Sequence, residues 1–187
     1  MRIDGEATRE RILSAAGREF AAFGLAGARV DRIAASASAS KERLYAYFGD
    51  KRSLFVAVLA AHMAELMESM PLTGDDLPGF VGRIFDFAVE HPEHFRMMDW
   101  ARLGGDFDLV PPIPAAVLDR DFDAISAAQA RGIVDPEWDP AELVPLLFAL
   151  ASTSAGAASF AGPGALSKPR SAHRAAAVRA ATKLVAP

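Results

Sequence analysis

Two short helices joined by a tight turn are predicted between residues 29 and 51, and this segment limits the possible architectures more than any other. The first helix is indicated by apolar residues at helical spacing: Val30, Ile33, Ala34 and Ala37. Ser38-Ala39-Ser40 interrupts the pattern, and the Ser40 hydroxyl can accept a backbone hydrogen bond from the first turn of a second helix. That helix turns Leu44 and Phe48 inward, four residues apart.

The outer face of the second helix has the side chains expected of a DNA-contacting helix. It carries Lys41, Arg43, Tyr45 and Tyr47, together with the acidic Glu42. A short helix of this kind, held on a partner helix, can enter the major groove. The alternative interpretation is a solvated helical corner that binds nothing.

Charge is distributed unevenly along the 187 residues. Residues 1–55 hold ten Lys and Arg against seven Asp and Glu, a net charge of +3, whereas residues 56–187 hold ten against seventeen, a net charge of −7. A basic front on an acidic body is typical of a DNA-binding head joined to a body that does not bind DNA. The net charge of the whole chain, −4, argues by itself against a nucleic-acid-binding protein.

Residues 8–55 contain further motifs in a definite order. They are Phe20 to Gly24 at the end of a first helix, the core residues Ile33, Ala34 and Ala37, the run Ser40, Lys41, Leu44, Tyr45 and Phe48, and Lys51 followed by Leu54 and Phe55. In order and spacing, this region resembles the DNA-binding region of the tetracycline-repressor (TetR) family of bacterial regulators. The turn departs from the family pattern, with Ser38-Ala39 in place of Gly-Val. Gly is favoured there because a tight turn can require positive φ, which Ser adopts at some strain cost.

The resemblance implies an all-α fold in which a three-helix helix-turn-helix head, residues 1–52, joins a larger helical body that binds a ligand and dimerises, residues 53–187. It implies DNA contacts from Arg29, Ser40, Lys41, Glu42, Arg43, Tyr45, Tyr47 and Lys51. Arg43 is expected to contact bases, because its long side chain can reach guanine O6 and N7. Glu42 would repel phosphate and could accept a hydrogen bond from a cytosine amino group. The phosphates are expected to be contacted by Ser40, Lys41, Tyr45, Tyr47 and Lys51.

About nine helices and no strand are predicted from apolar periodicity and capping residues. Beyond the pair described above, the predicted helices span residues 6–23, 51–70, 76–90, 92–103, 115–131, 139–160 and 171–185, with a Gly/Pro/Ser break at 162–169. The fourth helix is expected to join head and body. We expect Leu54, Val58, Met63 and Leu66 to pack on the body, and Phe55 and Leu59 to face the head.

The middle helices are rich in aromatic and Met side chains. By the family resemblance, a small-molecule pocket is expected there, formed by Phe80, Ile84, Phe87, Phe95, Met98, Trp100, Phe107 and Phe122. Few charged groups are free to meet a ligand, so we expect an apolar or weakly polar one. The alternative is a plain hydrophobic core.

Residues 143–160 carry no charge, and such a run is long enough to span a bilayer. It contains Pro145, Ser, Thr and many Ala residues, however, and the last helix is also Ala-rich. Small residues permit close helix approach, so we predict a homodimer through the last two helices, as in the TetR family, and no membrane span.

No motif of an enzyme, cofactor site or metal site is evident in the sequence. His91 and His94 lie three residues apart, but Pro92 stands between them and no third ligand is apparent, so a surface or capping role is predicted. The chain has no Cys, and its N-terminus lacks the apolar segment of a secretory signal, which suits a cytoplasmic protein. The predicted function is a ligand-responsive transcriptional regulator, a repressor that binds a palindromic DNA operator as a homodimer. The alternative is a helical small-molecule-binding module that no longer binds DNA.

Overall fold

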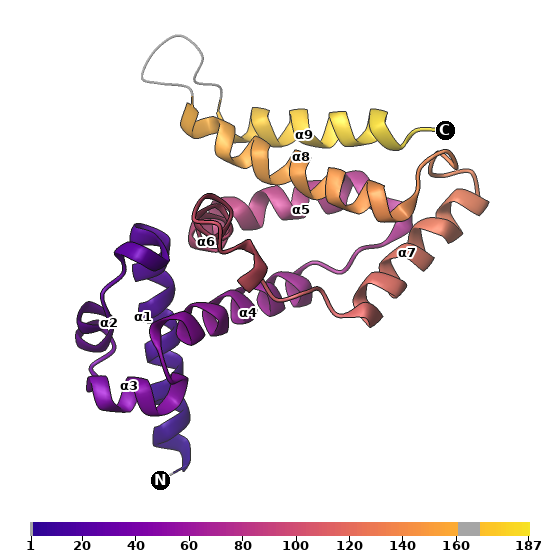
Figure 1. The fold of residues 1–187 in the computed structure, drawn as a ribbon. Coiled ribbons are helices and arrows are strands. Elements are labelled where there is room, and N and C mark those ends of the chain that lie inside the picture. The colour runs from indigo at the N-terminus through magenta and orange to yellow at the C-terminus, as the bar shows by residue number, and fades with distance from the viewer. Residues whose placement is uncertain (1, 161–168) are drawn as a thin grey trace. The chain divides into compact units, whose positions relative to one another are not determined.

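A computed structural model describes residues 2–160 and 169–187, and within these ranges the chain is all-α (Figure 1). The helices are α1 (Arg2–Gly27), α2 (Val30–Ser36), α3 (Lys41–Phe48), α4 (Lys51–Ser69), α5 (Leu77–Glu90), α6 (Pro92–Leu103), α7 (Ala115–Ala130), α8 (Pro140–Phe160) and α9 (Arg170–Val185). Two short 3₁₀ helices are η1 (Gly74–Asp76) and η2 (Phe107–Leu109). The predicted fold class is confirmed. The predicted break at 162–169 lies almost entirely outside the described residues.

Packing divides the chain into two compact units. The first comprises the described residues up to Leu66 together with His91–Pro112, and the second comprises Met67–Glu90 and Ile113–Pro187. The predicted boundary at residues 52/53 does not coincide with this division. The first unit also contains most of α4 and the whole of α6, because α6 packs along α1.

The core of the first unit is built by α1, α2, α3, α4 and α6. Its largest fully buried side chains are Ile12, Phe20, Ile33, Leu44, Leu54, Phe55 and Met97. The Phe20 and Phe55 rings meet edge to face, with centroids 5.0 Å apart. Leu54 and Val58 belong to this core together with Phe55 and Leu59, so the expected division of these four residues between two different surfaces is not found. The reason is that Leu54, Phe55, Val58 and Leu59 recur at helical spacing on one face of α4, so they are buried together in one core.

The corner after the first helix is shaped by Gly24. This residue has φ 66° and ψ 178°, which kinks α1 before one more helical turn ends it at Gly27. A Cβ atom at Gly24 would lie 2.9 Å from the indole ring of Trp100, so the position needs Gly for space as well as for conformation. Trp100 also donates a hydrogen bond from Nε1 to the carbonyl of Ala21, at 3.1 Å, which fastens α6 to α1.

The second unit packs α5, α8 and α9 together, with α7 against α8 and η1. Small residues, Ala151, Ala177 and Ala181, are fully buried between these helices and permit close approach. Arg174 on α9 donates from Nε to both carboxylate oxygens of Asp86 on α5, each at 2.8 Å. Within the described residues, no single helix is long and apolar enough to cross a membrane.

Candidate nucleic-acid interface

The turn between α2 and α3 is a complete helix-terminating motif built around Ser38. The N–H of Ala39 donates to the carbonyl of Ala34 at 3.0 Å, and the N–H of Ser38 donates to that of Ala35 at 3.2 Å. These two bonds define a Schellman motif, in which the residue at the position of Ser38 takes the left-handed conformation. Ser38 has φ 50°, the one positive φ of a non-Gly residue in the described ranges. The strained turn expected at this Ser is therefore present.

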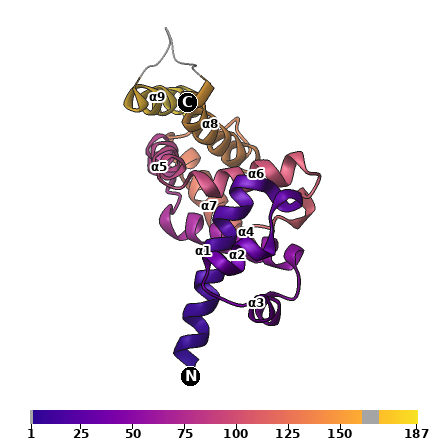
Figure 2. The ribbon, with the colours of Figure 1, turned by 90° about the vertical axis from the view of Figure 1, so that its left-hand side faces the viewer.

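Both ends of α3 are tied down by local hydrogen bonds. The Ser40 hydroxyl accepts the backbone N–H of Arg43 at 3.2 Å, as predicted for an N-cap. At the far end, the N–H of Gly49 donates to the carbonyl of Tyr45 at 2.8 Å. The Asp50 carboxylate then accepts the N–H of Ser53 at 2.6 Å and starts α4. This hydrogen bond lowers the pKa of Asp50. Leu44 and Phe48 are buried beneath the helix and hold α3 in position, whereas the side chains on its other face are exposed. Figure 2 shows α3 beside the N-terminal half of α1.

The open face of α3 presents two side chains of the predicted DNA-contacting set without partners among the described residues. Arg43 and Tyr45 are exposed, and neither makes a side-chain hydrogen bond or ion pair with any described residue. Glu42 is exposed beside them, and hydrogen bonds from its own backbone N–H and then from the Ser40 hydroxyl lower its pKa. A carboxylate therefore stays ionised next to the guanidinium of Arg43.

Three other residues of the predicted DNA-contacting set have partners within the chain. The Tyr47 hydroxyl donates to the carbonyl of Gly5 at 3.0 Å. Lys41 forms an ion pair with Asp31 on α2. The Lys51 ammonium donates to the carbonyls of Ala28 and Ala26, at 3.2 and 3.4 Å. Each must share or exchange these partners in order to bind a phosphate.

Arg29 is exposed at the start of α2 and gives that helix no side-chain cap. Its backbone N–H instead donates to the carboxylate of Glu19 on α1, at 2.8 Å. The same carboxylate oxygen accepts Nε of Arg32 at 2.8 Å. Partial burial by itself would raise the pKa of Glu19, but the hydrogen bonds from Arg32 and Arg29 outweigh it and hold the pKa below its usual value.

Glu19 and two arginines of α1 hold α2 in place, a role that the sequence patterns did not identify. Arg11 donates from Nε to the carbonyl of Ala37 at 3.3 Å, and Arg18 donates to the Ser36 hydroxyl at 3.4 Å. Glu19 holds the start of α2 against α1, and the two arginines hold the end of α2 against α1. The sequence shows that these side chains lie outside the apolar stripe of α1, but it does not show which residues they bind.

The residues of the predicted ligand pocket are divided between the two units. Phe95, Met98, Trp100 and Phe107 belong to the first, whereas Phe80, Ile84, Phe87 and Phe122 belong to the second. Phe80, Ile84 and Phe87 are buried in the second unit, and Trp100 and Phe107 are 40% and 50% exposed. The pocket stays a prediction.

The geometry of α2, the Ser38 turn and α3 defines the class: this is a helix-turn-helix DNA-binding protein. Two family models match the chain, described as "Bacterial regulatory proteins, tetR family" over residues 12–58 and "Tetracyclin repressor-like, C-terminal domain" over residues 76–183. The chain belongs to the TetR family of transcriptional regulators.

Individual relatives agree with this assignment. The HTH-type transcriptional repressor SCO4008 of Streptomyces coelicolor is 40% identical over 153 residues, which cover 80% of this chain and 79% of the relative. The HTH-type transcriptional repressor NicS of Pseudomonas putida is 34% identical over 98 residues, 49% of this chain and 46% of that protein. The crystal structure of SCO4942, a transcriptional regulator from Streptomyces coelicolor, has 39% identity and a TM-score of 0.81, covering 95% of this chain and 98% of that one.

Proposed function

We propose that the protein is a homodimeric, ligand-responsive repressor that binds a two-fold symmetric DNA operator. The observation that supports this proposal most directly is the open face of α3, where Arg43 and Tyr45 project from a helix capped at both ends. A helix fixed in this way loses little freedom on binding, so its side chains can contact base edges in a defined register.

The experiment is a fluorescence-anisotropy titration with the DNA upstream of the protein's own gene, a shuffled duplex as control, and two salt concentrations. Tighter binding to the native duplex, weakening with salt on both, is the expected result. Failure to bind either duplex at low salt would contradict the proposal. Equal binding to both would place the operator elsewhere in the genome.

Arg43→Ala tests the proposed base contact within that assay. The variant should lose about 1–3 kcal/mol of binding free energy on the operator and little on the shuffled duplex. Arg120→Ala, which removes an Arg from α7 of the second unit, is the matched control and should bind both duplexes as the wild type does. Equal loss on both duplexes for Arg43→Ala would show a phosphate contact instead.

The proposed dimer uses α8 and α9. It is supported by the uncharged sequence from Leu143 to Phe160 and by Leu146, whose side chain is 43% exposed on α8. Leu146→Glu should therefore weaken self-association in sedimentation equilibrium without unfolding the chain. An unchanged dissociation constant would place the interface on another surface.

The effector is proposed to be apolar or weakly polar. It can change DNA affinity only if it binds one conformation of the protein better than the other. A second candidate function, a ligand-binding module without DNA binding, is favoured by one observation: the ionised Glu42 on the exposed face of α3 would repel phosphate. The same anisotropy titration distinguishes the two.

A further inference from the structure

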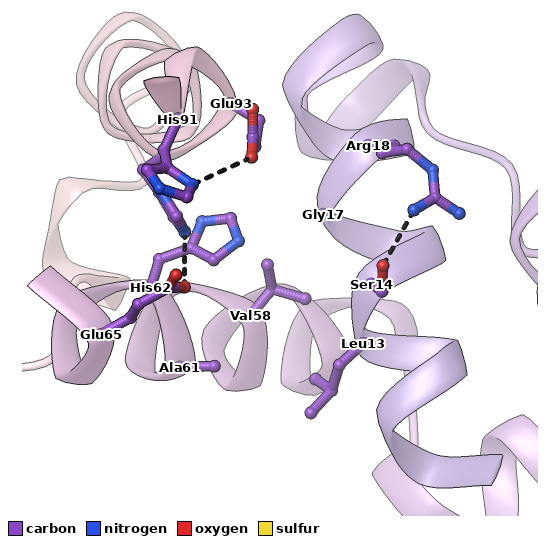
Figure 3. A pocket seen from close by; sticks show the side chains of 11 residues that line it. Leu13, Ser14, Gly17, Arg18, Val58, Ala61, His62, Glu65, His91 and Glu93 are labelled. Atoms are coloured by element: carbon purple, nitrogen blue, oxygen red, sulfur yellow. Dashed lines mark hydrogen bonds and ion pairs between the residues drawn. The ribbon is translucent and has the colours of Figure 1, made fainter. Parts of the chain in front are cut away.

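Three of the four histidines in the chain gather in a pocket of the first unit. The pocket has a volume of about 400 Å³ and lies among α1, α4 and the start of α6 (Figure 3). His62 and Glu65 come from α4, whereas His91, Glu93 and His94 come from the beginning of α6. Apolar groups of Leu13, Gly17 and Val58 line another part of it.

The side chains approach one another closely. The rings of His62 and His94 have centroids 3.7 Å apart, and those of His91 and His94 are 5.2 Å apart. Nε2 of His94 lies 3.3 Å from a carboxylate oxygen of Glu65. His91, Glu93 and His94 each offer one possible ligand atom, and these three atoms all lie within 4.8 Å of one another.

This spacing is close to that of a metal centre. Zinc–nitrogen bonds of 2.0–2.1 Å in a tetrahedral site place neighbouring ligand atoms about 3.3 Å apart. The atoms of His91, Glu93 and His94 lie within 4.8 Å of one another, so binding would draw them together by no more than about 1.5 Å. His62 and Glu65 lie three residues apart, so they face the same side of α4 and approach from the opposite helix.

The chemistry of the donors selects a class of metal ion. Imidazole nitrogens and carboxylate oxygens without thiolate suit Zn²⁺, Ni²⁺ or Cu²⁺, whereas Mg²⁺ and Ca²⁺ prefer oxygen ligands alone. A histidine ligand must be neutral. Burial, followed by the proximity of His94 and His91, lowers the pKa of His62 to about 3.

The alternative without a metal ion is a set of neutral core histidines stabilised by packing. His62 fits that alternative poorly, because its Nδ1 atom is buried and has no hydrogen-bond partner among the described residues. Leaving a buried polar nitrogen without a partner costs free energy that a bound metal ion would recover. A Cβ atom on Gly17 would lie 3.3 Å from Nε2 of the same ring, so α1 lies directly against the Nε2 edge of this imidazole.

We propose that His62, His91 and His94, with a carboxylate of Glu65 or Glu93, bind one divalent transition-metal ion of the Zn²⁺ type within the first unit. The ion would connect α4 to α6. It would therefore stabilise the unit that carries α3, whether or not the protein also responds to an organic effector.

The test uses the full-length protein, freed of metal with a chelator and then titrated with Zn²⁺ by calorimetry. One Zn²⁺ per chain and a higher melting temperature are expected. His62→Gln should weaken this binding at least about 10-fold. His173→Gln is the matched control, because it removes the one histidine outside the cluster, on α9 of the second unit, and should leave both readouts unchanged.

Two further variants guard against a folding defect. Glu65→Gln and Glu93→Gln each change a partly exposed residue, and the one that removes the ligand carboxylate should weaken Zn²⁺ binding while leaving the metal-free melting temperature unchanged. Co²⁺ substituted for Zn²⁺ should give the visible absorption of a low-symmetry, nitrogen-ligated site. Absence of saturable binding in the wild type would overturn the proposal. Equal loss from His62→Gln and His173→Gln would do so as well, because it would indicate adventitious surface binding.

Discussion

Replacing Ser38 by Gly should stabilise the helix-turn-helix. Ser38 occupies the left-handed region with φ 50° at the C-terminal end of α2. An L-residue pays about 1–2 kcal/mol for that conformation. Gly adopts it freely but loses about 0.5–1 kcal/mol through the greater freedom of its unfolded chain. Subtracting the midpoints of these two ranges gives a net gain of about 0.75 kcal/mol for Ser38→Gly, since the Ser38 side chain is exposed and buries no contact.

Urea unfolding followed by circular dichroism measures this difference. With a slope of about 2 kcal/mol per molar urea, the midpoint should rise by about 0.2–0.5 M. Amide hydrogen exchange gives the local value, because the N–H groups of residues 38 and 39 close the turn. Ser38→Ala is the control: it keeps the Cβ atom and should not gain. If Ser38→Ala gained as much as Ser38→Gly, the backbone-strain argument would be refuted.

Three further substitutions probe packing and charge. Met97→Ala should destabilise the protein by about 2–5 kcal/mol in thermal or urea unfolding, because the side chain is fully buried in the first unit. Gly74→Ala should also destabilise it, because a Cβ atom there would collide with the backbone carbonyl of Ala124. If the amide hydrogen exchange of α7 were as slow in this variant as in the wild type, the prediction would be contradicted. Glu19→Gln should flatten the stability-versus-pH curve. The pKa of Glu19 is lower in the folded protein than its unfolded value of about 4.5, so the ionised carboxylate stabilises the fold above that pH. This stability is lost as the pH falls through the pKa of the folded state. The Gln variant has no carboxylate and shows no such loss. An unchanged acid limb would exclude the carboxylate of Glu19 as a contributor.

Helix ends were the most predictable part of the fold. Ser40 caps α3 as predicted, and Asp50 caps α4 in the same way, because an N-cap uses a side chain and backbone groups only two or three residues away. The first helix was predicted to stop at Gly24, but it kinks there and continues for one turn to Gly27. Trp100 lies against this kink, a contact between residues 76 positions apart that local sequence patterns do not show.

The candidate DNA-binding residues show the same division. Exposure of Arg43 and Tyr45 could be predicted, because Leu44 and Phe48 determine which side of α3 faces the core. The hydrogen bond from Lys51 to the carbonyl of Ala28 could not be predicted, because the end of α1 is distant in sequence from the start of α4. Local spacing identifies a face of a helix, but it does not identify the neighbour that the face meets.

The amino-acid sequence by itself determined the all-α class, the order of the helices and the capped α2–turn–α3 segment, since periodicity and capping act over three to five residues. Tertiary structure alone decided that α6 packs with α1, and that His62 of α4 lies beside His94 of α6. An apolar stripe can be buried against any complementary surface, so the packing of the whole unit determines which helix it meets. For the same reason, His91 and His94 acquire a third imidazole only once the chain has folded.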